Sequence, residues 1–298
     1  MKFIKHQNID KNKWNSLATE FGQDSLYLKS WYLDVACPNW NAIVWGDYEA
    51  IMPLPTKDWW IIKKVYQPYF VQQTGIIHKP HLQLNNLLDD FLKSELPRYY
   101  FSFRSQFSSQ SIIDETILNN RKWNFQHKKN FVLDLENDYK ILSSNFNDNR
   151  KRNIKKGIAA GWKIERSEDL NAAIKMYKEN QAPKQKGLDN VVYQVLRRIF
   201  EATSHNNTGE LLVCKNSENE IISYAFFIHT SLKIYYLFGT MNAEGRQHSA
   251  ISLLFNELIK THAGKNLKLD FEGGNLESIG NFFASFGAQE EQYLSIWK

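Results

Sequence analysis

The sequence predicts an α/β protein with a mixed (α+β) sheet, built as a tandem duplication of one domain. Its 298 residues suffice for two domains of ordinary size. Strand-length apolar runs alternate with amphipathic helical segments along the chain. The order of these elements in the first half recurs in the second half, which we interpret as a duplication, with two unrelated α/β halves as the alternative. We therefore place the domains at residues 1–136 and 137–298.

The first half is expected to begin with helices and to continue through strands into a mixed region. Helical segments are predicted at residues 11–20, 30–36, 86–96 and 112–119. Strand segments are predicted at residues 41–45, 49–54, 59–66, 99–104 and 130–135.

The second half is expected to repeat this order. Helical segments are predicted at residues 170–179, 191–202, 249–263 and 276–286. Strand segments are predicted at residues 210–215, 221–230, 232–239, 267–271 and 293–297. The third of these helices has one apolar face that includes Leu254 and Leu258, and Gly264 is well placed to end it.

The composition is that of a globular protein, with 43% hydrophobic and 23% charged residues. The 2 cysteines, Cys37 and Cys214, lie far apart without neighbouring ligands, which fits a reducing compartment and argues against a disulfide framework. No apolar run approaches ~20 residues, and the start lacks a signal-peptide pattern. We expect a cytoplasmic protein without stable membrane insertion. The net charge of +5 is mild and does not by itself indicate a nucleic-acid binder.

A basic segment at residues 149–161 is the first candidate for function. One helical row at i, i+4 spacing comprises Phe146, Arg150, Ile154 and Ile158. Beside it lie two like-charge pairs, Lys151 with Lys155 and Arg152 with Lys156. Each pair costs about 0.2–0.5 kcal/mol in an isolated helix, so an anionic partner such as a phosphate is one explanation. A solvated helix face that pairs with Asp138 or Asp148 is the other, and both stay open.

The second candidate is a strand–loop–helix unit around residues 232–263. The start of a helix presents free N–H groups, and the helix dipole there favours anions. Arg246, Ser249 and Ala250 occupy this place, which would suit a pyrophosphate. The loop contains one glycine, Gly245, so an ordinary connection capped by Ser249 is the alternative.

The third candidate is the strand 267–271 and the residues that follow it. Leu269 and Phe271 alternate with Asp270 and Glu272, so we expect both carboxylates on one face of the strand. The run ends in Gly273-Gly274-Asn275, at the carboxyl end of a strand, where ligands of α/β sheets bind. A solvent-facing strand edge followed by a turn is the alternative.

Other catalytic patterns are missing from the sequence. It has no Gly-x-Ser-x-Gly elbow and no phosphate loop that ends in Gly-Lys-Ser/Thr. The histidines at 205, 229, 248 and 262 lack metal-type spacing, so no metal is expected. Neither cysteine has a partner that would mark it as a nucleophile.

Four segments together resemble the Fem-type (FemAB-like) branch of the GNAT N-acyltransferase superfamily. They are the basic segment 149–161, Gly245-Arg246-Gln247-His248-Ser249-Ala250, Leu269-Asp270-Phe271-Glu272-Gly273-Gly274, and Ile279-Gly280-Asn281-Phe282-Phe283-Ala284-Ser285-Phe286-Gly287-Ala288. The resemblance covers most of the second half and reaches the first half only through element order. It implies two GNAT-like domains, a diverged one at 1–136 and one with the active cleft at 137–298.

The resemblance also implies a function. Members transfer an acyl or aminoacyl group from acyl-CoA or aminoacyl-tRNA to an amine, which a small molecule or a lipid carries. The alternative is a non-catalytic GNAT-like module that binds a phosphate-bearing ligand or RNA. The loop before Ser249 departs from the glycine-rich pattern with which GNAT enzymes hold the coenzyme A pyrophosphate.

Residue roles follow from the resemblance. Donor binding falls to Arg246, Ser249 and Ala250. Substrate or donor phosphates would face Arg150, Arg152 and Lys155, and the cleft would be bordered by Tyr236, Gly273 and Asn275. In the first half, Phe101-Ser102-Phe103-Arg104 stands where the carboxylates would be, so we expect a cleft wall with acceptor contacts from Trp59, Trp60, Tyr66 and Tyr69.

The chemistry of amine acylation constrains the catalytic roles. The amine attacks the carbonyl directly, so the protein must position both substrates, accept a proton and stabilise an oxyanion. Asp270 or Glu272 would accept the proton, and Tyr235 or Tyr236 would donate to the leaving group. Because Tyr236 shares a face with Ile234 and Phe238, we expect Tyr235 to be the exposed one.

Overall fold

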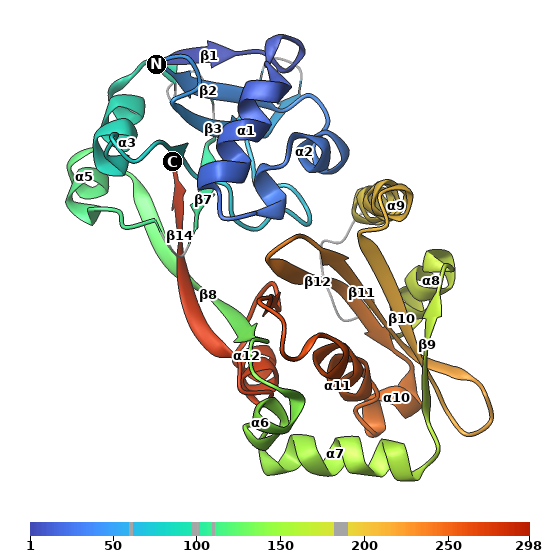
Figure 1. The fold of residues 1–298 in the computed structure, drawn as a ribbon. Helices are drawn as coiled ribbons and strands as arrows, with labels where there is room; N and C mark the ends of the chain where they lie inside the picture. The colour runs from blue at the N-terminus through green and yellow to red at the C-terminus, as the bar shows by residue number, and fades with distance from the viewer. Residues whose placement is uncertain (60–61, 97–99, 101, 109–110, 182–189) are drawn as a thin grey trace. The chain divides into compact units, whose positions relative to one another are not determined.

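The structure of the chain is a computed structural model, which describes all residues except 60–61, 97–99, 101, 109–110 and 182–189. It divides into two compact units. The first comprises Met1–Lys128 and Gln292–Lys298, and the second comprises Lys129–Glu291 (Figure 1). The predicted division at 136/137 differs from these units in two respects. The end of strand β8 belongs to the second unit, and the last seven residues of the chain return to the first.

The second unit is built on a mixed sheet. Its strands neighbour one another in the order β8 (Asn124–Asp134), β13 (Lys268–Asp270), β12 (Lys233–Met241), β11 (Ile221–His229), β10 (Gly209–Lys215) and β9 (Lys163–Ser167). The β12–β13 pair is parallel, and the other pairs in this series are antiparallel. This arrangement confirms the predicted mixed α/β class.

Helices cover both faces of this sheet. α11 (Ile251–His262) packs on the face of β10, β11 and β12 that holds the main core, and α7 (Asp148–Ala159) packs against α11 (Figure 1). α8 (Leu170–Asn180) and α9 (Asn190–His205) pack on β12 and β10 from the other side. The remaining helices of the unit are α6 (Tyr139–Ser144), α10 (Ala243–Gln247) and α12 (Glu277–Ala284).

A β-bulge interrupts β12. Phe226 of β11 is opposite Phe238, whereas the next residue, Phe227, is opposite Tyr236, so Leu237 is the extra residue. The bulge resets the alternation of side chains. Tyr236 before it contacts Phe255 of α11, while Phe238 after it contacts Tyr177 of α8. The two residues therefore lie on opposite faces, although their spacing predicts one face.

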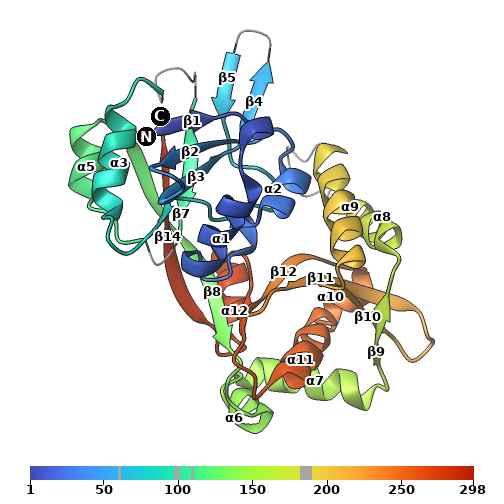
Figure 2. The same ribbon diagram turned by 45° about the horizontal axis from the view of Figure 1, so that its top comes forward.

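The first unit contains a small antiparallel sheet in the order β1 (Lys2–Ile4), β2 (Asn41–Trp45), β3 (Ala50–Leu54) and β6 (Ile77–His78). A separate hairpin, β4 (Thr56–Trp59) and β5 (Ile62–Val65), stands where one strand was predicted at 59–66 (Figure 2). The other elements are η1 (His6–Asn8), α1 (Lys11–Phe21), η2 (Leu26–Leu28), α2 (Ser30–Ala36), α3 (Leu84–Lys93), β7 (Arg104–Phe107) and α5 (Glu115–Asn120).

The end of the chain completes the first unit because its side chains are core residues there. β14 (Gln289–Trp297) pairs antiparallel with β7, with Leu294 opposite Phe107. Leu294 and Ile296 are buried in the same cluster as Phe91 and Phe103. The predicted last strand at 293–297 is thus confirmed as a strand.

Candidate functional site

Strand β12 loses its partner at the place where β13 ends. The parallel pairing runs only from Lys233 opposite Lys268 to Tyr235 opposite Asp270. β12 continues to Met241, and among the described residues no strand pairs with this edge of its second part. The strand pairing therefore ends next to the carboxyl group of Asp270, and we call this break in the pairing between β12 and β13 the opening of the sheet.

Asp270 is a buried and hydrogen-bonded carboxylate at the end of β13, only 3% exposed. Its Oδ1 accepts hydrogen bonds from Asn130 Nδ2 and from the backbone N–H of Glu272, both at 2.9 Å. Burial raises the pKa of Asp270, although nearby Lys233 and these hydrogen bonds act in the opposite direction. A carboxyl group with a raised pKa is suited to exchanging a proton with a substrate.

The residues after Asp270 leave the strand, which corrects the expectation that both carboxylates share one strand face. Glu272 has φ 57°, a left-handed conformation, so the extended alternation ends before it. Burial raises the pKa of Glu272 well above its usual range. A Cβ atom on Gly274 would lie 2.4 Å from the Phe131 ring, so this glycine permits the close approach of the turn to β8.

Two asparagine side chains connect the turn to β8 through hydrogen bonds. The Oδ1 atom of Asn130 accepts a hydrogen bond from the backbone N–H of Gly273 at 2.9 Å. The Oδ1 atom of Asn275 accepts one from the backbone N–H of Lys129 at 3.0 Å. Asn130 is fully buried and was missed by the sequence analysis, because nothing in the local sequence connects it to a strand 140 positions away.

The exposure of the two tyrosines of β12 differs from the expectation. Tyr235 is 1% exposed, so the expectation that it is the exposed one is wrong. The opposite face of β12 is covered as well, and Tyr235 lies in register with Asp270.

Tyr236 projects toward α11, where its ring lies 4.7 Å from that of Phe255. A Cβ atom on Gly239 would lie 2.0 Å from the Tyr236 hydroxyl, so the glycine makes room for it. This hydroxyl has no hydrogen-bond partner in the described part of the chain. Burial raises the pKa of Tyr236, so the hydroxyl keeps its proton and can donate it.

Arg150 is buried inside the unit, which corrects the expectation that it faces a phosphate. Its Nε donates to Ser285 Oγ at 2.9 Å and its Nη1 donates to Ser252 Oγ. The guanidinium lies 4.3 Å from the centre of the Phe282 ring. Burial lowers its pKa to about 10, so it stays charged at neutral pH. Arg150 thus ties α7 to α11 and α12.

The other cations of α7 are exposed. They are Lys151, Arg152, Lys155 and Lys156. In the described part of the chain none of them forms an ion pair with an acidic group. Asp138 instead caps α6 by accepting from the Ile141 N–H. Asn153 of the same helix donates to Ser249 Oγ at 3.3 Å, and Lys156 lies on the same side of α7, three positions further along.

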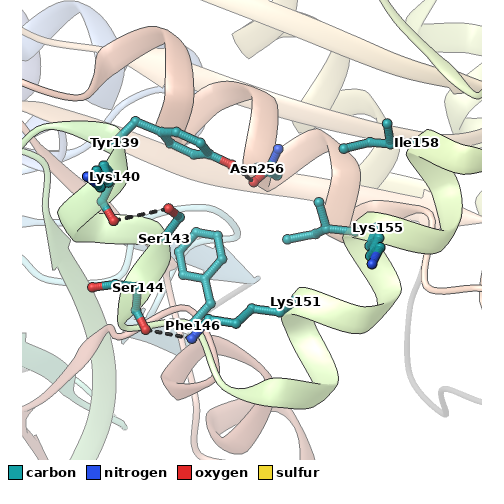
Figure 3. Close-up of a pocket in the computed structure, with 10 residues that line it drawn as sticks. Tyr139, Lys140, Ser143, Ser144, Phe146, Lys151, Lys155, Ile158 and Asn256 are labelled. Carbon is teal, nitrogen blue, oxygen red and sulfur yellow. Dashed lines mark hydrogen bonds between the residues drawn. The ribbon is translucent and has the colours of Figure 1, made fainter.

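A pocket of about 480 Å³ lies between α6, α7 and α11 (Figure 3). Phe146 and Ile154 form its apolar lining, and Lys140, Lys151 and Lys155 also line it. The Tyr139 hydroxyl donates to Asn256 Oδ1 at 2.7 Å, and Lys151 Nζ donates to the backbone carbonyl of Ser144 at 2.7 Å. The pocket is suited to a ligand with an apolar part and an anionic group.

The start of α11 differs from the predicted phosphate cradle. α10 fills the loop predicted at 240–248, and its last turn accepts hydrogen bonds from the N–H groups of Ser249 and Ala250. Ala250 is fully buried, which argues against direct donor contact through it. Arg246 is exposed, with Nη2 3.3 Å from the Asn180 carbonyl. The amide groups that would bind a pyrophosphate are therefore already in use.

Comparison with known proteins defines the class. Residues 144–277 match the acetyltransferase (GNAT) domain family, and this range includes β12, Asp270 and α7, the basic helix. This part of the chain is therefore a GNAT acetyltransferase domain. No curated protein matches the sequence. No helix among the described residues is long and apolar enough to cross a membrane.

The fold of the whole chain is similar to solved structures of a Fem protein and of a tandem GNAT protein. The structure of FemX superposes with a TM-score of 0.66 at 14% identity, covering 99% of this chain and 97% of that one. A tandem GNAT protein from the clavulanic acid biosynthesis pathway gives 0.58 at 13% identity, with coverage of 99% and 97%. L-PGS from Bacillus licheniformis gives 0.58 at 11% identity, with coverage of 97% and 92%. The predicted tandem GNAT-like fold is thus confirmed.

Proposed function

We propose that the protein transfers an aminoacyl or acyl group from an activated donor to an amine at the opening beside β12. The observation that carries this proposal is the buried carboxyl group of Asp270, held by Asn130 where the β12–β13 pairing ends. A buried base at an opening between parallel strands, inside a GNAT domain, supports acyl transfer.

The reaction needs a proton acceptor and a proton donor. The amine attacks the donor carbonyl and forms the new C–N bond, and Asp270 accepts the proton that the nitrogen loses. The bond from the carbonyl carbon to the leaving oxygen or sulfur then breaks, and the Tyr236 hydroxyl supplies a proton to that atom. We assign this role to Tyr236 rather than to Tyr235 because the Tyr236 hydroxyl has no hydrogen-bond partner among the described residues.

We favour aminoacyl-tRNA over acyl-CoA as the donor. The N–H groups of Ser249 and Ala250, where a pyrophosphate site was expected, are hydrogen-bonded to α10. Arg152 and Lys156 are exposed on α7, the helix whose Asn153 contacts Ser249, and would contact a nucleic-acid backbone. The acceptor is an amine on a small molecule or on a lipid carrier.

The test is donor binding followed by single-turnover transfer. We expect charged tRNA to bind with an affinity that falls steeply with salt, and expect Arg152→Glu and Lys156→Glu to weaken it at least tenfold. Lys175→Glu, an exposed lysine of α8, is the matched control and should bind as wild type does. Tight binding of acetyl-CoA that is lost in Arg246→Ala would instead support a coenzyme A donor.

The pocket of Figure 3 favours a second candidate function, a non-catalytic module that binds a phosphate-bearing ligand or RNA. Three lysines around an apolar lining would hold such a ligand without any reaction. If ligand binding depends on Lys151 and Lys155, and no amine accepts a group from any donor, the binding function replaces the transferase proposal.

A further inference from the structure

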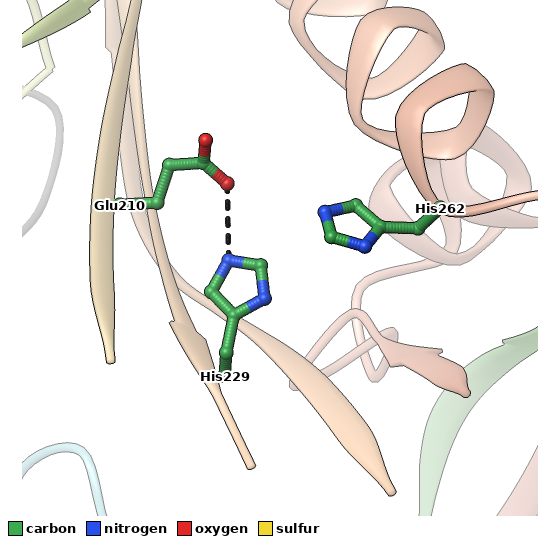
Figure 4. Close-up of side chains that lie close together, drawn as sticks. All are labelled: Glu210, His229 and His262. Atoms are coloured by element: carbon green, nitrogen blue, oxygen red, sulfur yellow. Dashed lines mark hydrogen bonds and ion pairs between the residues drawn. The ribbon is translucent and has the colours of Figure 1, made fainter. Parts of the chain in front are cut away.

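Three ligand-type side chains meet at one end of the second unit's sheet. Glu210 is the second residue of β10, and His229 and His262 are the last residues of β11 and α11. One carboxylate oxygen and one nitrogen from each ring all lie within 4.8 Å of one another, and His229 Nε2 is 3.0 Å from Glu210 Oε2. Figure 4 shows both rings turned toward the carboxylate.

We propose that Glu210, His229 and His262 form a site for one divalent metal ion of the zinc type, which ties the end of α11 to β10 and β11. Two histidines and a glutamate are a ligand set that zinc uses, with water as the fourth ligand. Tetrahedral zinc ligands lie about 3.4 Å apart, so the side chains need to close by roughly 1 Å. The end of α11 adds a negative partial charge that favours a cation.

The surroundings leave room for the ion. A pocket of about 190 Å³ borders Glu210 and His262, and Glu257 also lines it. Arg166 holds Glu210 Oε1 at 2.8 Å, so Oε2 remains directed at His229.

The second charged neighbour is Lys265, whose Nζ lies 3.4 Å from His262 Nδ1, which leaves the other ring nitrogen for the metal.

The site lies at the opposite end of α11 from the basic helix α7. The start of α11 borders the basic helix, whereas His262 ends α11, about 18 Å away for a helix of twelve residues. His229 is opposite Ile234 near the beginning of β12. Metal binding and melting temperature can be measured without any acyl transfer, so the test does not depend on the proposed function. No metal was expected from the sequence because the three ligands are far apart along the chain.

The experiment uses the full chain after dialysis against a chelator. Calorimetric titration with Zn²⁺ is expected to show one site per chain, and Zn²⁺ is expected to raise the melting temperature. His229→Ala and His262→Ala should weaken binding by about 100-fold or more, beyond the effect of losing an outer partner. His205→Ala, an exposed histidine of α9, is the matched control and should bind as wild type does.

Two further variants make the result decisive. Arg166→Ala should tighten Zn²⁺ binding severalfold, because Glu210 loses a competing cation. His262→Gln keeps a polar side chain of similar size. It replaces His262→Ala in the binding test if the alanine variant unfolds without metal. If Zn²⁺ fails to stabilise wild type, or stabilises the His262 variants equally, the three residues are only an ion-pair cluster and the proposal is overturned.

Discussion

Asn130 connects the catalytic candidate Asp270 to the turn that follows it. Its amide donates to the Asp270 carboxylate, and its carbonyl oxygen accepts from the N–H of Gly273, each at 2.9 Å. One buried side chain therefore sets both the direction of the carboxylate and the path of the turn. Asn130→Ala should destabilise the protein by about 1–3 kcal/mol, since it leaves buried groups unpaired. Urea unfolding measures this loss, and a change below the error of the fit would contradict it.

The raised pKa of Asp270 predicts a pH dependence for both activity and stability. Activity should rise with pH as the carboxyl loses its proton, and Asp270→Asn should abolish turnover while donor affinity persists. The folded state binds this proton more tightly than the unfolded state does. The stabilising contribution is thus present below the unfolded pKa and declines as pH rises to the folded value.

Comparison of wild type and Asp270→Asn in urea at several pH values tests the stability part. The variant should lack this decline, so its relative stability should increase with pH. Parallel curves for the two proteins would show that the pKa of Asp270 is not raised by folding.

Tyr236 and Tyr235 form a matched pair on adjacent positions of β12. Tyr236→Phe should lower the rate of transfer by about 100-fold or more, the usual contribution of a positioned proton donor. Its stability should hardly change, because the hydroxyl has no partner among the described residues. Tyr235→Phe should retain most of the rate. Equal rates for Tyr236→Phe and wild type would remove Tyr236 from the reaction.

The buried guanidinium of Arg150 predicts a structural role. Arg150→Met should lower the free energy of unfolding by about 1–3 kcal/mol, because Ser252 and Ser285 lose their donor inside the protein. Arg152→Met, two positions along the same helix and exposed, should stay within about 0.5 kcal/mol of wild type. Reversed sizes for these two effects would contradict the observed orientation of α7.

Gly273 and Gly274, which follow Glu272, should lose different amounts of stability when each is replaced by alanine. Gly274→Ala would put a Cβ atom 2.4 Å from the Phe131 ring, at φ 132°, and should destabilise by more than about 1 kcal/mol. Gly273→Ala meets nothing within 4 Å and should cost less. Chemical unfolding of both variants measures the difference, and equal losses would show that contact with Phe131 is not the cause.

The spacing of apolar residues predicted the structure correctly where a single helix or strand period determines it. The helix predicted at 249–263 is observed as α11, and Ile154 of the predicted row 146–158 is buried on α7. Phe146 is buried but precedes α7, and Ile158 is 63% exposed. The same row contains Arg150, which the sequence analysis directed outward. Charge alone does not reveal that two serines and two aromatic rings from distant helices enclose it.

Alternation failed where the strand was irregular. The extra residue Leu237 placed Tyr236 and Phe238 on opposite faces, and the left-handed Glu272 ended the alternation after Asp270. Likewise α10 formed inside a predicted loop and accepts hydrogen bonds from the N–H groups of Ser249 and Ala250, just before α11.

By itself, the sequence determined the mixed α/β class and the order of elements, and its resemblance to the Fem-type GNAT branch predicted the tandem GNAT-like fold. These follow from spacing within single segments, where the period of a helix or strand acts directly. Only the tertiary structure decided the partners: Asn130 for Asp270, the serines for Arg150, and the meeting of Glu210, His229 and His262. Such contacts join residues that are distant along the chain, and they depend on strand register and helix packing, which local spacing does not encode.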